Sequence, residues 1–501
     1  MRIATVTRAM GLIAAMLLLA PATLQAEASR SPVSVGGYFR VMARPDLQGG
    51  NGRLGHWNLY GRLLNEGPWA ALELRLRLLE SSPGSRDPWT SVHFKLEGGA
   101  IANAEPSSGW LGAFRLAQAY VQAGNVGLPG VTWKLGTLDT WLGDLGLYDM
   151  RPAQLFYETL GLSGSGSLGP LEILVGAGDS GFYIRGLEYS PILTGGGYLR
   201  LRAPRHLEVA VGGQVMFEPP VQGSRFAPYE TPGMNYEDWL RGEVVERFLD
   251  DNPGQEDFFT APEAVSSVSG KAIGSLGFGD LGPLRWNSLF VSYTRRHPEN
   301  STTETVDGRD YELYVTKFTD ERYELVLGNE LQLQLVPDRL DLAWSVLFGD
   351  HRDGDNDIQP SDFDRWYLST VLRVQAYLSR TVHLLVESSV AREVSRNGNQ
   401  FRNHGDSIFQ SAAGQADSRG LEFGDADERR TWQGKAGVVL NPLGPGLYVR
   451  PSLRLLYGVQ YSTQNHAFGN SFVESLSQFN LFGSWETHWH HVIALEAEAW
   501  F

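Results

Sequence analysis

The feature that most constrains this chain is a repeated alternation of apolar and polar residues. From Leu72 to Leu78, a leucine stands at every second position and alternates with Glu73, Arg75 and Arg77. The same pattern returns in residues 207–215, 331–335, 340–348 and 372–378. Because successive side chains of a β-strand point to opposite faces, each segment predicts a strand with one apolar and one polar face. We therefore predict an all-β protein built from many such strands.

The connections between these segments are of two kinds. Tight turns are predicted at Pro337-Asp338 and at Ser379-Arg380, where the alternation resumes at once. Long polar connections without alternation are predicted over residues 218–265, 349–364 and 392–430. Short turns at one set of strand ends and long loops at the other are typical of outer-membrane β-barrels. A soluble β-sandwich also contains alternating strands, so it stays the alternative at this point.

The end of the chain favours the barrel. Apolar residues alternate with polar ones from Ile493 to the terminal pair Trp500-Phe501. A barrel closes only when its last strand pairs with its first, and a strand that runs to the chain terminus meets that need. We therefore predict one domain, residues 29–501, that forms a closed antiparallel transmembrane β-barrel.

The first residues have the pattern of a secretory signal peptide. Arg2 and Arg8 precede an apolar run over residues 10–22, and small residues offer cleavage after Ala26 or after Ala28. We expect residues 1–26 to be removed, with residue 28 as the alternative cleavage position. The rest of the chain has no apolar stretch of the roughly 18 residues that a membrane-spanning helix needs.

Composition and motifs exclude several classes of function. The chain has no cysteine, which excludes thiolate metal sites and cysteine nucleophiles, and its formal charge of -15 argues against a general affinity for nucleic acid. No HExxH, CxxC or glycine-rich phosphate loop is present, and no nucleophile motif accompanies His488, His490 and His491. We therefore expect neither an enzyme nor a cofactor-binding protein.

One short run could hold a structural calcium ion. Asp353, Asp355 and Asp357 offer oxygens at alternate positions, as a calcium loop does. The glutamate that completes an EF-hand does not follow, so a solvated loop is the alternative. The preceding long connection, residues 218–265, carries 11 acidic residues against three arginines. That segment is either a solvated surface insertion or a lid.

Several short motifs, taken in order, resemble those of the maltoporins, the sugar-specific porins of bacterial outer membranes. The motifs are Gly37-Tyr38-Phe39-Arg40, Arg53-Leu54-Gly55 with Tyr60, Phe114-Arg115 before residues 119–124, residues 136–166 with Asp144 and Asp149, Arg450-Pro451 with Arg454, and Trp500-Phe501. The resemblance implies a homotrimer of eighteen-stranded barrels, with long extracellular loops and an inward-folded constriction loop. It also implies facilitated diffusion of oligosaccharides across the outer-membrane lipid.

The resemblance further implies two sets of lining residues. The aromatic path that guides the sugar falls on Tyr38, Tyr60, Trp110, Tyr367 and Trp500. The ionic track at the constriction falls on Arg40, Arg53, Arg115 and Asp149, and we predict that Arg62 and Arg151 belong to the same constriction. Strand parity turns Tyr38 and Arg40 inward together, and places Tyr60 and Arg62 on one face of a second predicted strand. Order and inward parity favour the aromatic path most for Tyr38 and Tyr60. An interfacial belt of aromatic residues is the alternative for a lone Tyr or Trp.

The chain departs from the family pattern at the constriction. Arg62 stands where the family has an acid, and Leu142, Gly146 and Arg151 replace its constriction-loop residues. Additional arginines suit an acidic sugar or another anion. A general or anion-selective porin and a polysaccharide exporter therefore stay open as alternatives, and the direction of flow is open too.

Overall fold

The computed structural model describes most of the chain after the predicted signal peptide. The described residues are 32–45, 54, 58–80, 86–98, 115–157, 159–181, 192–203, 207–218, 226–228, 267–296, 301–306, 309–315, 322–353, 365–395, 428–463 and 489–501. Among these residues, no helix is both long enough and apolar enough to cross a membrane.

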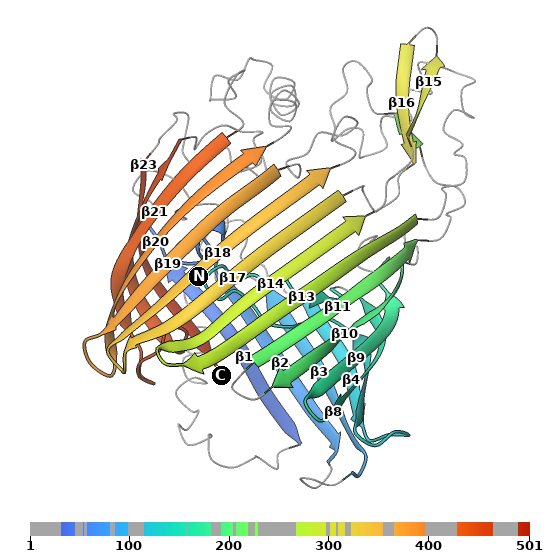
Figure 1. Ribbon diagram of the computed structural model, residues 1–501, viewed down its shortest axis with the longest axis horizontal. Helices are drawn as coiled ribbons and strands as arrows, with labels where there is room; N and C mark the ends of the chain where they lie inside the picture. The colour runs from blue at the N-terminus through green and yellow to red at the C-terminus, as the bar shows by residue number, and fades with distance from the viewer. Residues whose placement is uncertain are drawn as a thin grey trace, which may run out of the picture.

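Eighteen antiparallel strands form one closed barrel (Figure 1). They are β1 (Val33–Ala43), β2 (Trp69–Leu79), β3 (Trp89–Gly98), β4 (Arg115–Gly124), β5 (Val131–Thr137), β8 (Leu160–Leu168), β9 (Leu171–Asp179), β10 (Leu193–Ala203), β11 (Leu207–Glu218), β13 (Ser267–Leu281), β14 (Leu284–Arg296), β17 (Arg322–Val336), β18 (Leu340–Asp353), β19 (Arg365–Tyr377), β20 (Val382–Ser395), β21 (Glu428–Leu440), β22 (Ser452–Ser462) and β23 (Trp489–Trp500). Each strand pairs with the next in this series, and β23 pairs with β1, where Trp500 lies opposite Tyr38. The predicted closed barrel is confirmed.

The turns and the chain end also agree with the sequence. β17 and β18 are joined through residues 337–339, with Val336 opposite Leu340, and β19 and β20 are joined through residues 378–381. The short turns gather at one end of the barrel (Figure 1), and the long connections leave from the opposite strand ends. Phe501 exchanges two backbone hydrogen bonds of 2.9 and 3.1 Å with Gly37, so the last residue helps to close the barrel.

The outer surface of the barrel is apolar. Leu199 and Leu201 of β10 and Val211 of β11 are exposed on it, and similar residues follow at alternate positions of the other strands. A closed barrel satisfies every strand hydrogen bond internally, and an apolar outer face is stable against lipid. The molecule is thus a transmembrane β-barrel.

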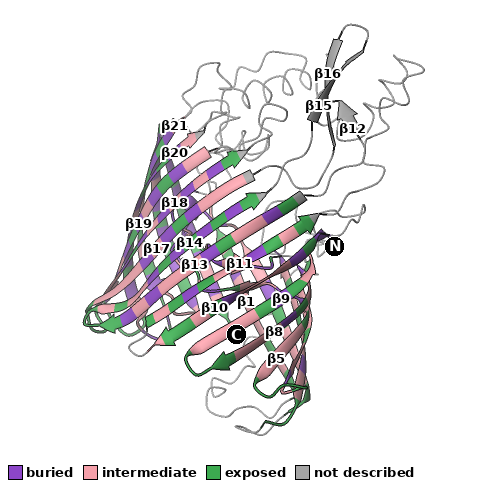
Figure 2. Ribbon diagram, turned by 45° about the vertical axis from the view of Figure 1, so that its right-hand side comes forward, coloured by how far each residue is buried: buried purple, intermediate pink, exposed green. Residues whose placement is uncertain are grey.

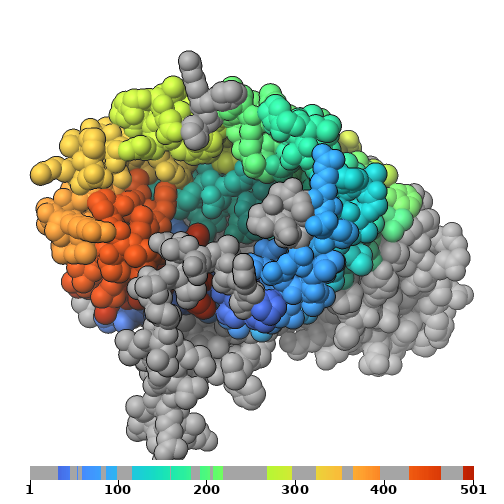
Figure 3. Space-filling view, turned by 90° about the horizontal axis from the view of Figure 1, so that it is seen from below, coloured from blue at the N-terminus to red at the C-terminus, as the bar shows by residue number. Residues whose placement is uncertain are grey.

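Two segments leave the wall and lie inside the barrel. The first inward segment, residues 58–66, follows β1 and begins with the short helix η1 (Asn58–Tyr60). The second inward segment, residues 138–159, lies between β5 and β8 and contains the paired strands β6 (Thr140–Trp141) and β7 (Gln154–Leu155). The two segments touch, because the Arg62 amide donates to the Leu147 carbonyl at 2.8 Å. Seen from the short-turn end, the barrel is hollow, with teal-coloured chain inside it (Figure 3).

A third, small sheet stands apart from the barrel at the end of the long connections (Figure 1). It consists of β12 (Phe226–Pro228), β15 (Ser301–Val306) and β16 (Arg309–Val315). β12 belongs to the acidic stretch 218–265, and most of that stretch lies outside the described residues.

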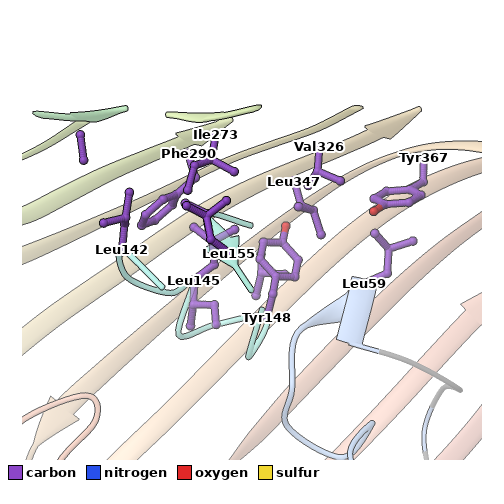
Figure 4. Packing of buried hydrophobic residues seen from close by; sticks show 14 of the residues in the cluster. Leu59, Leu142, Leu145, Tyr148, Leu155, Ile273, Phe290, Val326, Leu347 and Tyr367 are labelled. Atoms are coloured by element: carbon purple, nitrogen blue, oxygen red, sulfur yellow. The ribbon is translucent and has the colours of Figure 1, made fainter. Parts of the chain in front are cut away.

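The inward segments are held by apolar packing against one side of the barrel, as Figure 4 shows for part of the cluster. Leu142, Leu145 and Leu155 of the second segment are buried against wall residues such as Phe290 and Leu347. A second cluster joins Leu54, Leu63 and Leu64 to Leu385, Val439, Leu456, Val492 and Ala494. We call the strands that carry these contacts, β10, β11, β13, β14 and β17 to β23, the covered wall.

The burial pattern shows where the interior remains open. Strands of the covered wall alternate between exposed and buried residues, as β19 and β21 do, because the inward segments cover their inner faces (Figure 2). Strands β2 to β5 lack that strict alternation, and most of their inward residues are only half-buried. We call β2 to β5 the open wall. The passage through the barrel therefore runs off its axis, between the open wall and the inward segments.

Candidate channel lining and constriction

A cluster of charges joins the first inward segment to the line where the barrel closes. The buried carboxylate of Glu498 in β23 accepts hydrogen bonds from Arg62 Nη2 at 2.6 Å and from the Tyr38 hydroxyl at 2.8 Å. It also pairs with Arg450 and Arg454. We call these five residues the seam cluster. Two of these arginines also reach a second carboxyl group, because Glu496 lies 3.9 Å from Arg454 and Glu66 lies 3.4 Å from Arg62. Opposite charges therefore alternate at this point of the lumen.

Two carboxyl groups lie beside the seam cluster and share a hydrogen bond. Glu66 pairs with Arg40, lies 3.4 Å from Arg62 Nε, and is hydrogen-bonded to Asp149. Burial raises the pKa of Glu66 to about 7. Burial also acts to raise the pKa of Asp149. The charges of Arg62 and Arg40 and the hydrogen bond with Glu66 outweigh burial, so the pKa of Asp149 is lowered. Below about pH 7 the pair therefore holds one proton, on Glu66, while Asp149 is ionised.

The structure brings three of the predicted ionic-track residues together. Arg40, Arg62 and Asp149 meet at Glu66, where the two inward segments approach β1. Arg151 lies on the second inward segment with its guanidinium 4.1 Å from the centre of the Trp141 ring.

Arg115 is placed differently. It is the first residue of β4 and pairs with Glu97 of β3 at 3.1 Å. This position follows a long connection and therefore lies at the rim of the open wall. The prediction that Arg115 borders the narrowest point is corrected accordingly.

Two aromatic residues of the predicted path keep exposed surface. Tyr38 and Trp500 meet edge to face across the seam, with ring centres 6.1 Å apart. Trp500 is 68% exposed, and its place at the end of β23 puts it near the short-turn mouth of the barrel. Tyr38 is partly buried and its hydroxyl is held by Glu498. This pair offers an aromatic surface to a solute in the lumen.

Tyr60 and Tyr367 do not fit the predicted stacking role. Each is 1% exposed, so neither ring has a free face. The Tyr60 hydroxyl donates to Glu393 and accepts from Arg429 Nη2 at 2.6 Å, which fixes the first inward segment to β20 and β21. Tyr367 packs against His351, with ring centres 5.4 Å apart. Both residues hold the structure together instead of lining the passage.

Sequence reasoning missed a buried ionic anchor on the covered wall. Arg373, Glu387 and Lys435 lie side by side on β19, β20 and β21. Arg373 Nη2 and Lys435 Nζ lie 2.6 and 2.8 Å from the Glu387 carboxylate, and Lys435 Nζ also donates to the Tyr60 carbonyl at 2.8 Å. Alternation shows that these side chains point inward. It does not show that another segment covers them.

Several predicted residues cannot be placed. Arg53, Trp110, Asp355 and Asp357 lie outside the described residues, as does the predicted signal peptide. Asp353 ends β18, but its side chain also lies outside the described part. The calcium site therefore stays a prediction.

The closed barrel, its apolar outer face and its charged lumen define the molecule as an outer-membrane-type β-barrel. No protein-family model and no curated protein matches the chain.

Solved outer-membrane barrels show a distant likeness to this chain. The outer-membrane channel DcaP of Acinetobacter baumannii is 9% identical, with 94% of this chain and 97% of that chain covered and a TM-score of 0.45. OmpF of Salmonella typhi, in complex with daunomycin, is 8% identical, with 94% and 97% covered and a TM-score of 0.40. The anion-selective porin from Comamonas acidovorans is 11% identical, with 72% and 89% covered and a TM-score of 0.35.

Proposed function

We propose that this protein is a channel of the bacterial outer membrane through which saccharides pass by facilitated diffusion. The observation that carries the proposal is the off-axis passage, in which exposed rings and charged side chains border the same space. The inward segments narrow the barrel at the seam cluster and leave the open wall free. An unselective water-filled barrel would need neither the paired rings of Tyr38 and Trp500 nor the arginines of the seam cluster.

The chemistry of a sugar explains this combination of residues. A pyranose ring has patches of C–H on its faces and hydroxyl groups around its edge. Trp500 and Trp141, which are 68% and 38% exposed, offer broad ring surfaces to those faces. Arg151 and the ionised Asp149 can exchange hydrogen bonds with the hydroxyls. Several weak and overlapping contacts let the solute move on, whereas one tight site would hold it.

The resemblance to maltoporins supports the same proposal and adds a homotrimeric assembly to it. The chief competing function is a general or anion-selective porin, since Arg62, Arg450 and Arg454 gather in the seam cluster. Export of a polysaccharide uses the same passage in the opposite direction.

The test is single-channel conductance in planar bilayers, with and without added oligosaccharides. We expect saccharides to block the ion current of the wild-type channel. Tyr38→Ala and Trp500→Ala should each weaken the block several-fold, because one lost stacking surface costs about 1 kcal/mol. The current without sugar should stay the same or rise, since it depends on pore width and charge.

Trp489→Ala is the matched control for these variants. Trp489 lies on the same strand as Trp500 but on the outer face, opposite in alternation to the buried His490. Its loss should leave the block unchanged. If no saccharide blocks the wild-type channel, the general porin becomes the better description.

A further inference from the structure

The open wall carries basic side chains in register with one tyrosine. Arg75 of β2 lies opposite His93 of β3, and His93 lies opposite Tyr120 of β4. Lys134 of β5 completes the group, with Nζ 4.1 Å from the centre of the Tyr120 ring. We call Arg75, His93 and Lys134 the basic row. All three side chains are half-buried and belong to the inward parity of their strands.

Tyr120 holds two members of the basic row in place. The His93 ring stacks on the Tyr120 ring, with centres 4.5 Å apart and planes inclined by 15°. The Lys134 ammonium lies against the same ring from the neighbouring strand on the other side. A cation held against an aromatic ring loses little further freedom when an anion arrives.

Arg75 and Lys134 differ from the other cations of the open wall in their partners. Lys95 lies 3.0 Å from Glu97, and Arg115 lies 3.1 Å from the same carboxylate. Within the part of the chain that the structure describes, neither Arg75 nor Lys134 has a carboxylate within 4.0 Å. Glu97 is thus engaged by other cations, and Asp139 accepts a hydrogen bond from Gln154 Nε2 at 2.6 Å. Glu73 stands on the same face of β2 as Arg75 and lies opposite Lys95.

We propose that the basic row binds the carboxylate of an acidic saccharide, so that the channel passes acidic oligosaccharides in preference to neutral ones. This inference rests on the proposed saccharide channel and names its substrate class. A guanidinium and an ammonium donate charge-assisted hydrogen bonds to a carboxylate. The passage is walled by protein, which strengthens their field over its value in open water.

The first measurement compares two solutes on the wild-type channel. Trimers of galacturonate and trimers of glucose have similar size and differ mainly in their carboxylates. We expect galacturonate trimers to block the ion current several-fold more strongly than glucose trimers at the same ionic strength. Equal block by the two trimers would overturn the inference and leave the saccharide channel standing.

The second measurement removes the charges one at a time. Arg75→Gln and Lys134→Gln should each weaken the block by galacturonate trimers roughly fivefold, or about 1 kcal/mol, and leave the block by glucose trimers unchanged. Arg115→Gln removes the same charge from the same wall, but its guanidinium is paired with Glu97, so the block should change less than twofold. Lys134→Arg should retain the block, which separates charge from folding.

A third measurement separates acidic sugars from small anions. The reversal potential in a potassium chloride gradient reports chloride selectivity. Phosphate, added at the same concentration of charge as the galacturonate trimers, serves as a competing small anion. Suppose that Arg75→Gln and Lys134→Gln change the chloride selectivity, and that galacturonate trimers reduce the current no more than phosphate does. The basic row then attracts anions in general, and the inference is wrong. If neither trimer blocks at all, the proposed function itself fails.

Discussion

Replacing Tyr60 with phenylalanine tests whether this residue anchors the first inward segment or lines a sugar path. The change keeps the ring and removes only the hydroxyl that joins Glu393 and Arg429. Both partners are buried, at 0% and 4% exposure, so water does not replace the lost contacts. A hydrogen bond to a charged group contributes about 1.5–3 kcal/mol, and two such bonds are lost. Since Arg429 still contacts Glu393 at 3.1 Å, the net cost should fall near 2–3 kcal/mol.

The free energy of unfolding, from urea titration of the protein in lipid vesicles, measures this cost. Tyr457→Phe is the control, because it removes a hydroxyl from the outer face, where Tyr457 is 46% exposed. In bilayers, Tyr60→Phe should raise the frequency of conductance fluctuations, because the segment at the constriction is less firmly held. Unchanged stability together with weaker saccharide block would show that Tyr60 lines the path after all.

Three further predictions concern the anchors and the constriction. Glu387→Gln leaves Arg373 and Lys435 without their carboxylate and should lower the free energy of unfolding by about 3–5 kcal/mol in the same titration. Gly61→Ala should cost about 1–3 kcal/mol and raise conductance, because Gly61 has φ +83° and its Cβ would lie 2.8 Å from Glu387 Oε1; unchanged conductance would count against the anchoring. The pKa of Glu66 is raised from 4.5 to about 7, so the folded state binds a proton that the unfolded chain has released. Stability should therefore fall as pH rises from about 4.5 through 7, and anion selectivity should fall with it, whereas Glu66→Gln should flatten both profiles.

The barrel could be predicted from the sequence because its cause is local. Alternation over Leu72 to Leu78 and the turn at Pro337-Asp338 depend on residues close in the chain, and both are confirmed. The closure was predicted from the terminal strand, whose Phe501 bonds to Gly37. Strand parity also placed Tyr38 and Arg40 in the lumen, where the structure has them.

The interior could not be predicted as well, because strand parity does not apply outside strands. The predicted second strand with Tyr60 and Arg62 on one face is wrong, because residues 58–60 form a short helix and a turn follows. Nothing local distinguishes a buried anchor from an exposed ring there. One signal was available for the second inward segment. Leu142, Leu145 and Leu147 are too apolar for a solvated loop, and such a stripe indicates packing against a wall. Which wall it covers depends on contacts with strands more than a hundred residues away, such as β17 and β18.

The covered wall and the open wall place the anchoring residues and the basic row in different parts of the sequence. The residues that clamp the inward segments, such as Glu387 and Lys435, belong to late strands, whereas the basic row lies between residues 75 and 134. Substitutions at distant sites with no shared partners have nearly additive effects. Substitutions within residues 75–134 can thus change the selectivity of the channel without weakening the contacts that hold the inward segments. The same barrel could acquire a new solute through substitutions in the four adjacent strands β2 to β5 alone. The same four strands are the place to begin when the selectivity is to be engineered.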